Sequence, residues 1–196
     1  GWFKILGQVG LGITVGAVLY FNSDVKIWRE YRGTPPAGDT SVITRTVNNR
    51  VKHFVETKDP ITTIPFVKNH EFNYTKLLPA SIREYSWILY ILVVIFIITA
   101  VSNGSNITDG LDGLATGTSA LIGVLLGIFA YASGNFFFAD YLNIMYIPGL
   151  GELSIFIAAM IGGCVGFLWY NSYPAQVFMG DTGSLTLGGI IAALAI

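Results

Sequence analysis

Charge is scarce in this chain and unevenly placed. Only 12% of the 196 residues are charged, against a usual share of ~25%, while 53% are apolar. Residues 22–84 hold ten of the eleven Lys and Arg and seven of the twelve Asp and Glu. The charges outside that stretch are Lys4, Asp109, Asp112, Asp140, Glu152 and Asp181. This distribution argues against an ordinary soluble domain.

Two further classes are excluded by what the sequence lacks. The formal net charge is −1, so the chain has no basic face that could release counterions from a phosphate backbone, which excludes a general nucleic-acid binder. The single cysteine, Cys164, excludes an internal disulfide framework. Because Cys164 lies in an apolar run, we expect it to be a small buried side chain.

Long uncharged runs fill the rest of the sequence. A hydrocarbon layer ~30 Å thick needs ~20 apolar helical residues to cross it, and most of these runs supply them. We predict five helical spans, at about residues 3–21, 86–102, 113–132, 153–170 and 183–196. Three glycine pairs at small-xxx-small spacing predict close helix packing: Gly12/Gly16, Gly123/Gly127 and Gly162/Gly166. The prediction is an all-α polytopic membrane protein, with residues 1–196 as a single transmembrane domain.

The charged residues 22–84 are too polar to lie in lipid, so we predict an extramembrane loop. Partial alternation from Ser41 to Glu56 around Asn48-Asn49 predicts a β-hairpin within it, because asparagine tolerates positive φ. The count of basic residues in the loop does not settle its side of the membrane, since the positive-inside rule fades for loops beyond ~60 residues.

Five spans fix which segments share a side of the membrane, whatever the orientation. Residues 102–112 and 171–182 lie on the same side as residue 1, and the loops 22–84 and 132–152 face the other way. This parity brings together Asp109, Asp112 and Asp181, so that the three acids can share one site.

The first candidate segment, residues 102–115, reads SNGSNITDGLDGLA. We interpret it as a polar, glycine-rich loop that runs into a span, with Asn106, Thr108 or Asp109 as candidate caps of the following helix. If that helix has begun, Asp109 and Asp112 project from one face. Capping explains one acid but not two beside hydrocarbon, where carboxylates are costly unless partnered.

The second candidate segment, residues 170–184, reads YNSYPAQVFMGDTGS and also leads into a helix. Gly180 and Gly183 allow a ligand to approach the backbone, and backbone amides at a helix start favour phosphate. Asp181 is a hard oxygen donor of the kind that Mg²⁺ takes beside substrate phosphates, and Phe178 could stack on a planar ring. A helix cap is the competing interpretation for each acid. Together the residues predict a membrane-surface pocket for a Mg²⁺-bound, phosphate-bearing ligand.

The motifs NITDGLDGLA (residues 106–115) and FMGDTGS (residues 178–184) closely resemble those of the polyprenyl-phosphate N-acetylhexosamine-1-phosphate transferases, and the resemblance covers the whole chain. Thr108 and Thr182 favour the phospho-N-acetylmuramoyl-pentapeptide transferase branch of that superfamily. The resemblance implies a ten-span, Mg²⁺-dependent enzyme of the bacterial inner membrane with a cytoplasmic active site. Residues 22–84 would then be periplasmic.

The activity implied by the resemblance is one step of peptidoglycan synthesis in cell wall biogenesis. Phospho-MurNAc-pentapeptide passes from UDP-MurNAc-pentapeptide to undecaprenyl phosphate, which gives lipid I and UMP. The partners implied are these two substrates and the lipid bilayer, with no nucleic acid, and a homodimer stays open. Mg²⁺ and Lys4 would neutralise the charge that builds on the diphosphate during transfer.

The resemblance also implies residue roles. Asp181 would be the Mg²⁺ ligand, Asp112 and the backbone near Gly110 would form the uracil wall, and Phe178 would stack on the uracil. The residues that would line the ribose and diphosphate region are Asn106, Asp109, Asn171 and Gly180, with Lys4 near the phosphates. We expect Asp109, Asp112 and Asp181 to be the catalytic acids.

Part of the family pattern is missing from the chain. Its paired aspartates precede the first predicted span and its histidine-rich loop follows the last, so we expect a fragment of a longer protein that is inactive on its own and for which no general base can be named. Two alternatives remain: a UDP-GlcNAc:undecaprenyl-phosphate GlcNAc-1-phosphate transferase, and a membrane transporter whose acids lie near the bilayer centre.

Overall fold

The computed structural model describes residues 2–31, 42–47, 50–57, 61–63, 71–76, 79–142 and 144–196. Five long helices dominate it: α1 (Trp2–Phe21), α2 (Ser86–Thr108), α3 (Leu114–Gly134), α5 (Leu153–Asn171) and α6 (Gly180–Ala195). They fall on the five predicted segments. Among the described residues, the helical segments containing α1, α2, α3 and α5 are long and apolar enough to cross a membrane, while α6 has 16 residues. The predicted all-α polytopic membrane fold is confirmed.

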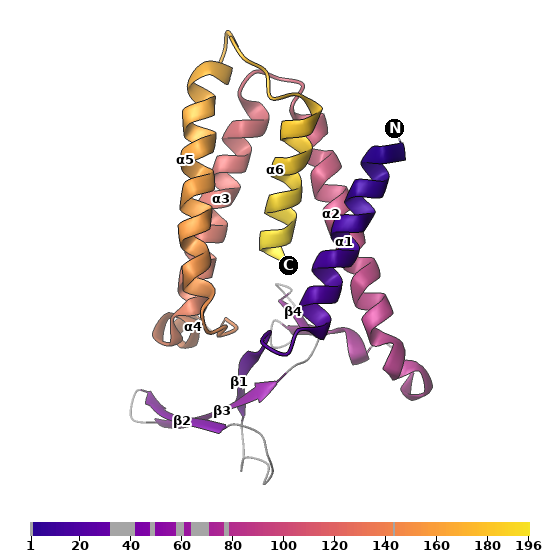
Figure 1. Ribbon diagram of the computed structural model, residues 1–196. Coiled ribbons are helices and arrows are strands. Elements are labelled where there is room, and N and C mark those ends of the chain that lie inside the picture. Colours follow the sequence, from indigo (N-terminus) through magenta and orange to yellow (C-terminus); the bar gives the residue numbers. More distant parts are fainter. Residues whose placement is uncertain are drawn as a thin grey trace.

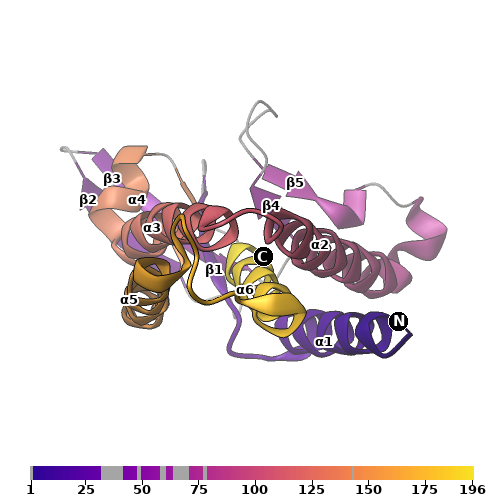
Figure 2. The same cartoon turned by 90° about the horizontal axis from the view of Figure 1, so that it is seen from above.

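The helices form two packed groups joined by α6. Helix α1 packs on α2, α2 packs on α6, and α3 packs on α5 and also contacts α6. Seen from above, α6 lies between the α1–α2 pair and the α3–α5 pair (Figure 2).

The two ends of the bundle differ in what they carry. The start of α1, the turn between α2 and α3 (residues 109–113) and the loop between α5 and α6 (residues 172–179) lie at one end, called here the motif end (Figure 1). The strands and the short helix α4 (Phe136–Leu142) lie at the other, the strand end. The parity expected from five spans therefore matches the arrangement of the helices.

Glycines set the closest helix contacts. A Cβ at Gly12 would lie 2.8 Å from the Ile95 Cα, and one at Gly16 would lie 3.3 Å from the Ile91 Cα, so α1 rests directly on the backbone of α2. On α3, a Cβ at Gly123 would lie 2.8 Å from the Met160 Cε of α5. These two glycine pairs pack as predicted, since Gly127 likewise faces α5 through Ile157.

The third pair does not. A Cβ at Gly162 or Gly166 would meet nothing within 4 Å, so the prediction of close packing there is wrong for the described residues. The reason is that α5 meets α3 through larger side chains, among them Ile157 and Ile161. That contact turns the glycines of α5 away from α3.

Two apolar clusters fill the bundle on either side of α6. Val94 and Ile98 of α2 pack with Ala192 of α6. Ala120 of α3, Cys164 of α5, and Leu187 and Ile191 of α6 form the second cluster. Cys164 is buried, as expected.

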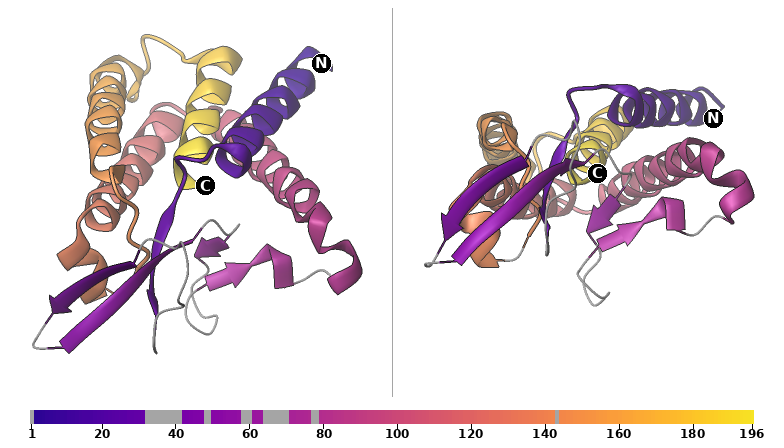
Figure 3. Two further views of the ribbon diagram at one scale, coloured as in Figure 1. Left: turned by 60° about the horizontal axis from the view of Figure 1, so that its bottom comes forward. Right: turned by 90° about the horizontal axis from the view of Figure 1, so that it is seen from below.

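The strand end holds a three-stranded antiparallel sheet in the order β1 (Ile27–Tyr31), β3 (Arg50–Thr57), β2 (Val42–Val47), and a pair of short strands, β4 (Ile61–Thr63) and β5 (Glu71–Asn73). The pairing of β2 with β3 confirms the two strands of the predicted hairpin, while its expected turn at Asn48-Asn49 lies outside the described residues. Short 3-10 turns occupy Tyr74–Lys76, Ala80–Tyr85 and Leu150–Glu152. Figure 3 views this end from below, with β1, β2 and β3 beside α4.

Candidate functional site

The first motif is largely helical, which corrects the predicted loop at residues 102–115. Helix α2 runs on to Thr108, and Asp109 is its C-cap. The polar side chains fit this helix because they bond to its own carbonyls: Asn103 Nδ2 donates to Thr99 O (2.8 Å) and Thr108 Oγ1 donates to Gly104 O (2.8 Å). Such back-bonding satisfies the side chains without ending the helix.

The start of α3 corrects two further expectations. Its N-cap is Gly113, with φ 73° and no side-chain cap, so neither Asn106, Thr108 nor Asp109 caps this helix. Asp109 ends one helix and Asp112 precedes the next, so they do not share a helical face. The left-handed backbone at Gly113 is readily available only to glycine, and it lets the chain reverse within residues 109–113.

Asp112 joins the two motif segments. Its Oδ2 accepts a hydrogen bond from the backbone N–H of Ala175 in the α5–α6 loop (3.0 Å). Asn171, which is 3% exposed, makes a second connection, since Thr116 Oγ1 donates to its Oδ1 (3.1 Å) and its Nδ2 donates to Val177 O (2.9 Å). Both side chains therefore hold the loop that carries Phe178, and Asn171 reaches no exposed surface itself.

The second motif places Asp181 in the first turn of α6. The helix begins at Gly180, whose φ is 68°, with Met179 as N-cap. Asp181 therefore does not cap α6, but its carboxylate is favoured by the positive end of the helix dipole. Asp181, Gly180 and Phe178 are all exposed, and Phe178 is 69% exposed.

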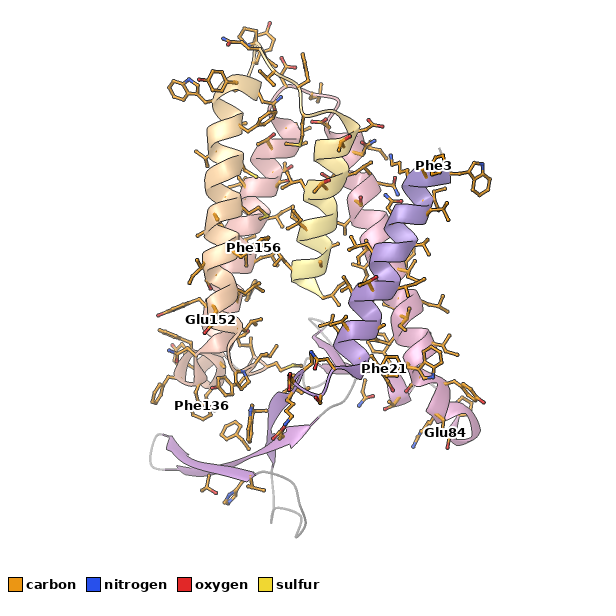
Figure 4. All side chains as sticks on the ribbon, in the orientation of Figure 1. Phe3, Phe21, Glu84, Phe136, Glu152 and Phe156 are labelled. Carbon is orange, nitrogen blue, oxygen red and sulfur yellow. The ribbon has the colours of Figure 1, made fainter. Side chains whose placement is uncertain are left out.

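Asn106 stands at the centre of the site, between a cation and a carboxylate. Its Nδ2 donates to Ser184 Oγ (3.0 Å) and Asp181 Oδ1 (3.3 Å), and its Oδ1 accepts from Lys4 Nζ (3.2 Å). This orientation of the amide pairs each donor with an acceptor, because the Ser184 hydroxyl is itself 3.0 Å from Gly180 O, to which it donates. The side chains come from α1, α2 and α6, and Phe3, the neighbour of Lys4, marks this end in Figure 4.

Asp109 lies beside the same group. Burial is the largest influence on its carboxyl and raises its pKa, the backbone N–H of Gly180 lowers it, and the charge of Asp181 raises it again. The net effect is a raised pKa. Two carboxylates close enough to repel each other favour a cation or a proton between them.

The predicted residues thus fall into two sets. Lys4, Asn106, Asp109, Gly180 and Asp181 come together, whereas Asp112 and Asn171 fasten the loop beside them. Within the described ranges no three His, Cys, Asp or Glu side chains gather as a complete metal cage. The first set can bind an anion through Lys4 and the helix start, and it can share a divalent cation with that anion through Asp181.

Sequence reasoning missed the polar groups that hold the site together. Ser184 is fully buried, and Gln8 (7% exposed) donates through Nε2 to Ser102 Oγ at 3.2 Å. A signal was present for Gln8, since it interrupts an otherwise apolar run and follows Lys4 by one helical turn. Nothing in the sequence marked Ser102 or Ser184 as buried.

The glycosyl transferase family 4 model matches residues 44–196. Three relatives cover the whole chain, and each carries the name phospho-N-acetylmuramoyl-pentapeptide-transferase. They come from Parabacteroides distasonis, 58% identical over 46% of its length, Flavobacterium johnsoniae, 57% over 48%, and Amoebophilus asiaticus, 56% over 47%. The chain thus spans about half the length of the curated relatives it matches. With more than half of its residues matched by the family model, and with both motifs meeting at one end of a membrane helix bundle, the chain belongs to glycosyl transferase family 4.

Proposed function

We propose that this chain is part of a phospho-N-acetylmuramoyl-pentapeptide transferase. The reaction moves phospho-MurNAc-pentapeptide from UDP-MurNAc-pentapeptide to undecaprenyl phosphate and yields lipid I and UMP. The observation that carries the proposal is the contact of Asn106 with Lys4 on one side and Asp181 on the other at the motif end. The names of the relatives support the muramoyl-pentapeptide substrate over UDP-GlcNAc.

The donor set at the motif end suits Mg²⁺ shared with a substrate. Mg²⁺ keeps several waters and binds through one or two carboxylates plus substrate phosphates. Asp181 offers one exposed carboxylate, and Asp109 lies close enough that the Asp181 charge adds to the effect of burial in raising the pKa of Asp109. Asp181 would hold the ion, which would supply charge neutralisation at the diphosphate.

The chain's own side chains divide the remaining work. Lys4 would place its ammonium against the phosphates, where it offsets negative charge as the lipid phosphate oxygen attacks and UMP leaves. The Asn106 amide bonds to both Lys4 and Asp181, which keeps the ammonium and the carboxylate on either side of one side chain. Phe178, exposed on a loop fastened by Asp112 and Asn171, would stack on the uracil.

The setting of the site fits a reaction between a soluble nucleotide sugar and a lipid. The motif end lies at the ends of the apolar helices rather than at their middle (Figure 1), which disfavours a transporter with ion sites near the bilayer centre. We place this end at the cytoplasmic face of the bacterial inner membrane and residues 22–84 in the periplasm.

The test uses the full-length enzyme with undecaprenyl phosphate and measures UMP release against Mg²⁺ concentration. Asp181→Asn should lower kcat at least ~100-fold, the scale of losing one preorganised electrostatic group, with only a small change in melting temperature. Asp24→Asn, the same change at an exposed residue near the strand end, is the control and should match wild type. UMP release that Asp181→Asn leaves intact would contradict the assignment.

Substrate choice and completeness are tested in the same assay. Turnover of UDP-GlcNAc in place of UDP-MurNAc-pentapeptide would move the proposal to the GlcNAc-1-phosphate transferase. That purified residues 1–196 alone are inactive stays a prediction, which lipid I formation by that fragment would overturn. The oligomeric state, for which a homodimer is one option, is measured by the mass of the detergent-solubilised protein.

A further inference from the structure

A second polar cluster lies directly below the site, inside the helix bundle. Gln8 of α1 donates through Nε2 to Ser102 Oγ of α2 (3.2 Å), and Ser102 Oγ donates in turn to Leu185 O of α6 (2.9 Å). Asn103 Nδ2 donates to Gln8 Oε1 (3.2 Å) as well as to its own helix. Gln8, Ser102, Asn103 and the Leu185 carbonyl are called here the buried rung.

The buried rung repeats the site one helical turn deeper on each of three helices. The site uses Lys4, Asn106 and Asp181, and the rung uses Gln8, Ser102 and Leu185. The offset is four residues on every helix, and its direction agrees with chain direction, because α1 and α6 run away from the motif end while α2 runs toward it (Figure 1). Residues four apart stack on one helical face.

Because the polar groups of the rung are buried, their hydrogen bonds favour one position of α1 relative to α2. Gln8 is 7% exposed and Ser102 is 2% exposed, and a buried amide that loses its partners costs free energy. A rotation or a slide of α1 along α2 would break the bonds of Gln8 to both Ser102 and Asn103. The glycine contacts deeper in the bundle fix the distance between the helices, and the hydrogen bonds of Gln8 add a dependence on direction.

We propose that Gln8 is a positioning residue for Lys4. Its hydrogen bonds to α2 hold α1 in the rotation and axial position that bring the Lys4 ammonium to Asn106 and to the substrate phosphates. Gln8 itself touches no reacting atom. The proposal rests on the phosphate-binding role of Lys4 in the proposed function.

The test is a double-mutant cycle in the full-length enzyme. The four proteins are wild type, Gln8→Met, Lys4→Ala and the double variant, each assayed for kcat and KM with UDP-MurNAc-pentapeptide. Methionine keeps the length and flexibility of glutamine and removes its hydrogen bonds. Gln8→Met should lower kcat/KM by about 10-fold, since small misplacements of an orienting group are costly, and it should have almost no further effect once Lys4 is alanine.

A matched control lies on the same helix. Thr14→Ala removes a hydroxyl that donates only to Gly10 O of its own helix on the exposed side of α1, and it should leave kcat/KM unchanged. If Gln8→Met does not fold, Ser102→Ala removes the same bond from the α2 side and enters the same cycle. The melting temperature of each variant separates loss of folding from loss of positioning.

Each outcome decides the proposal. Non-additive losses support it, because Gln8 then acts through Lys4. Gln8→Met activity equal to wild type overturns it, and so do losses that multiply with that of Lys4→Ala, because the rung would then be structural only. Failure of wild-type enzyme to use any UDP-sugar would instead overturn the proposed function on which it rests.

Discussion

The two ends of the helix bundle are held by different forces. At the motif end, hydrogen bonds between polar side chains join α1, α2 and α6, with Asn106 at their centre. At the strand end, aromatic rings pack together, with the centroids of Phe54 and Phe136 4.8 Å apart and those of Phe136 and Tyr146 5.6 Å apart, and the Trp28 backbone N–H also donates to Tyr146 O at 3.2 Å. One end positions charges and the other fastens a sheet to the bundle, so substitutions should separate activity from stability.

The largest effect is expected at the strand end. Phe136→Ala removes a buried ring, 8% exposed, and should lower the free energy of unfolding by about 3 kcal/mol, the scale of a core Phe→Ala change. Specific activity of the folded enzyme should not change. Thermal unfolding in detergent measures the first and UMP release the second, with the exposed neighbour Phe137→Ala as the control. Figure 4 marks Phe136 well away from the motif end.

At the motif end, a substitution should lower activity more than stability. Asn106→Leu removes the amide between Lys4 and Asp181 and should lower kcat about 100-fold, comparable with the loss of one preorganised donor, with a smaller change in melting temperature. Gln176→Leu removes an exposed amide from the adjoining loop and serves as the control. A larger loss of stability than of activity in Asn106→Leu would break the contrast between the two ends.

Substitution of Asn171 should affect both stability and substrate binding, with effects of intermediate size. Asn171→Ala leaves the Thr116 hydroxyl and the Val177 carbonyl without their side-chain partner. Thr116 is buried, and leaving a buried polar group unsatisfied costs about 1–3 kcal/mol. Because the loop carries Phe178, KM for the UDP substrate should rise while kcat changes less. Thr116→Val removes only one of the two bonds and should give the smaller shift in both measurements.

The smallest effect is a pH dependence at Asp109. A pKa raised in the folded state means that ionised Asp109 disfavours folding at neutral pH, and that this penalty is relieved as pH falls through the raised pKa toward the ordinary value. Asp109→Asn should therefore melt slightly higher than wild type near pH 7, by no more than ~2 °C. The difference should vanish below the pKa of an unfolded aspartate. A variant less stable than wild type at neutral pH would contradict the cause assigned to the shift.

The sequence alone predicted the fold at the level of spans and sides of the membrane. Long uncharged runs predict the helices directly, and the number of spans places Asp109, Asp112 and Asp181 at one end of the bundle. Polar residues near the end of a span predict that the helix stops there, so the sequence ends α2 too early. Its Asn103 and Thr108 instead bond to carbonyls of the same helix, a choice that sequence patterns do not reveal.

The sequence predicts the charged residues of the candidate site but not the hydrogen bonds that hold them in place. Lys4 and Asp181 are visible because charges are rare outside residues 22–84. The pairing of Asn106 with both depends on how three helices pack, and Asn171 proved to be buried among loop contacts rather than open to a ligand. Contacts between distant segments leave no local pattern in the sequence.

One face of α1 contacts α2 at every fourth residue. The four contacts are Lys4 with Asn106, Gln8 with Ser102, Gly12 with Ile95 and Gly16 with Ile91. Each helical residue turns the chain by about 100°, so one residue inserted between Gln8 and Gly12 would leave either the glycines or the lysine facing lipid. A single substitution in this helix affects one of these contacts, whereas a change in the length of the helix displaces several of them together. A comparison of related enzymes should therefore find that residue types in α1 vary while the number of residues in the helix stays constant.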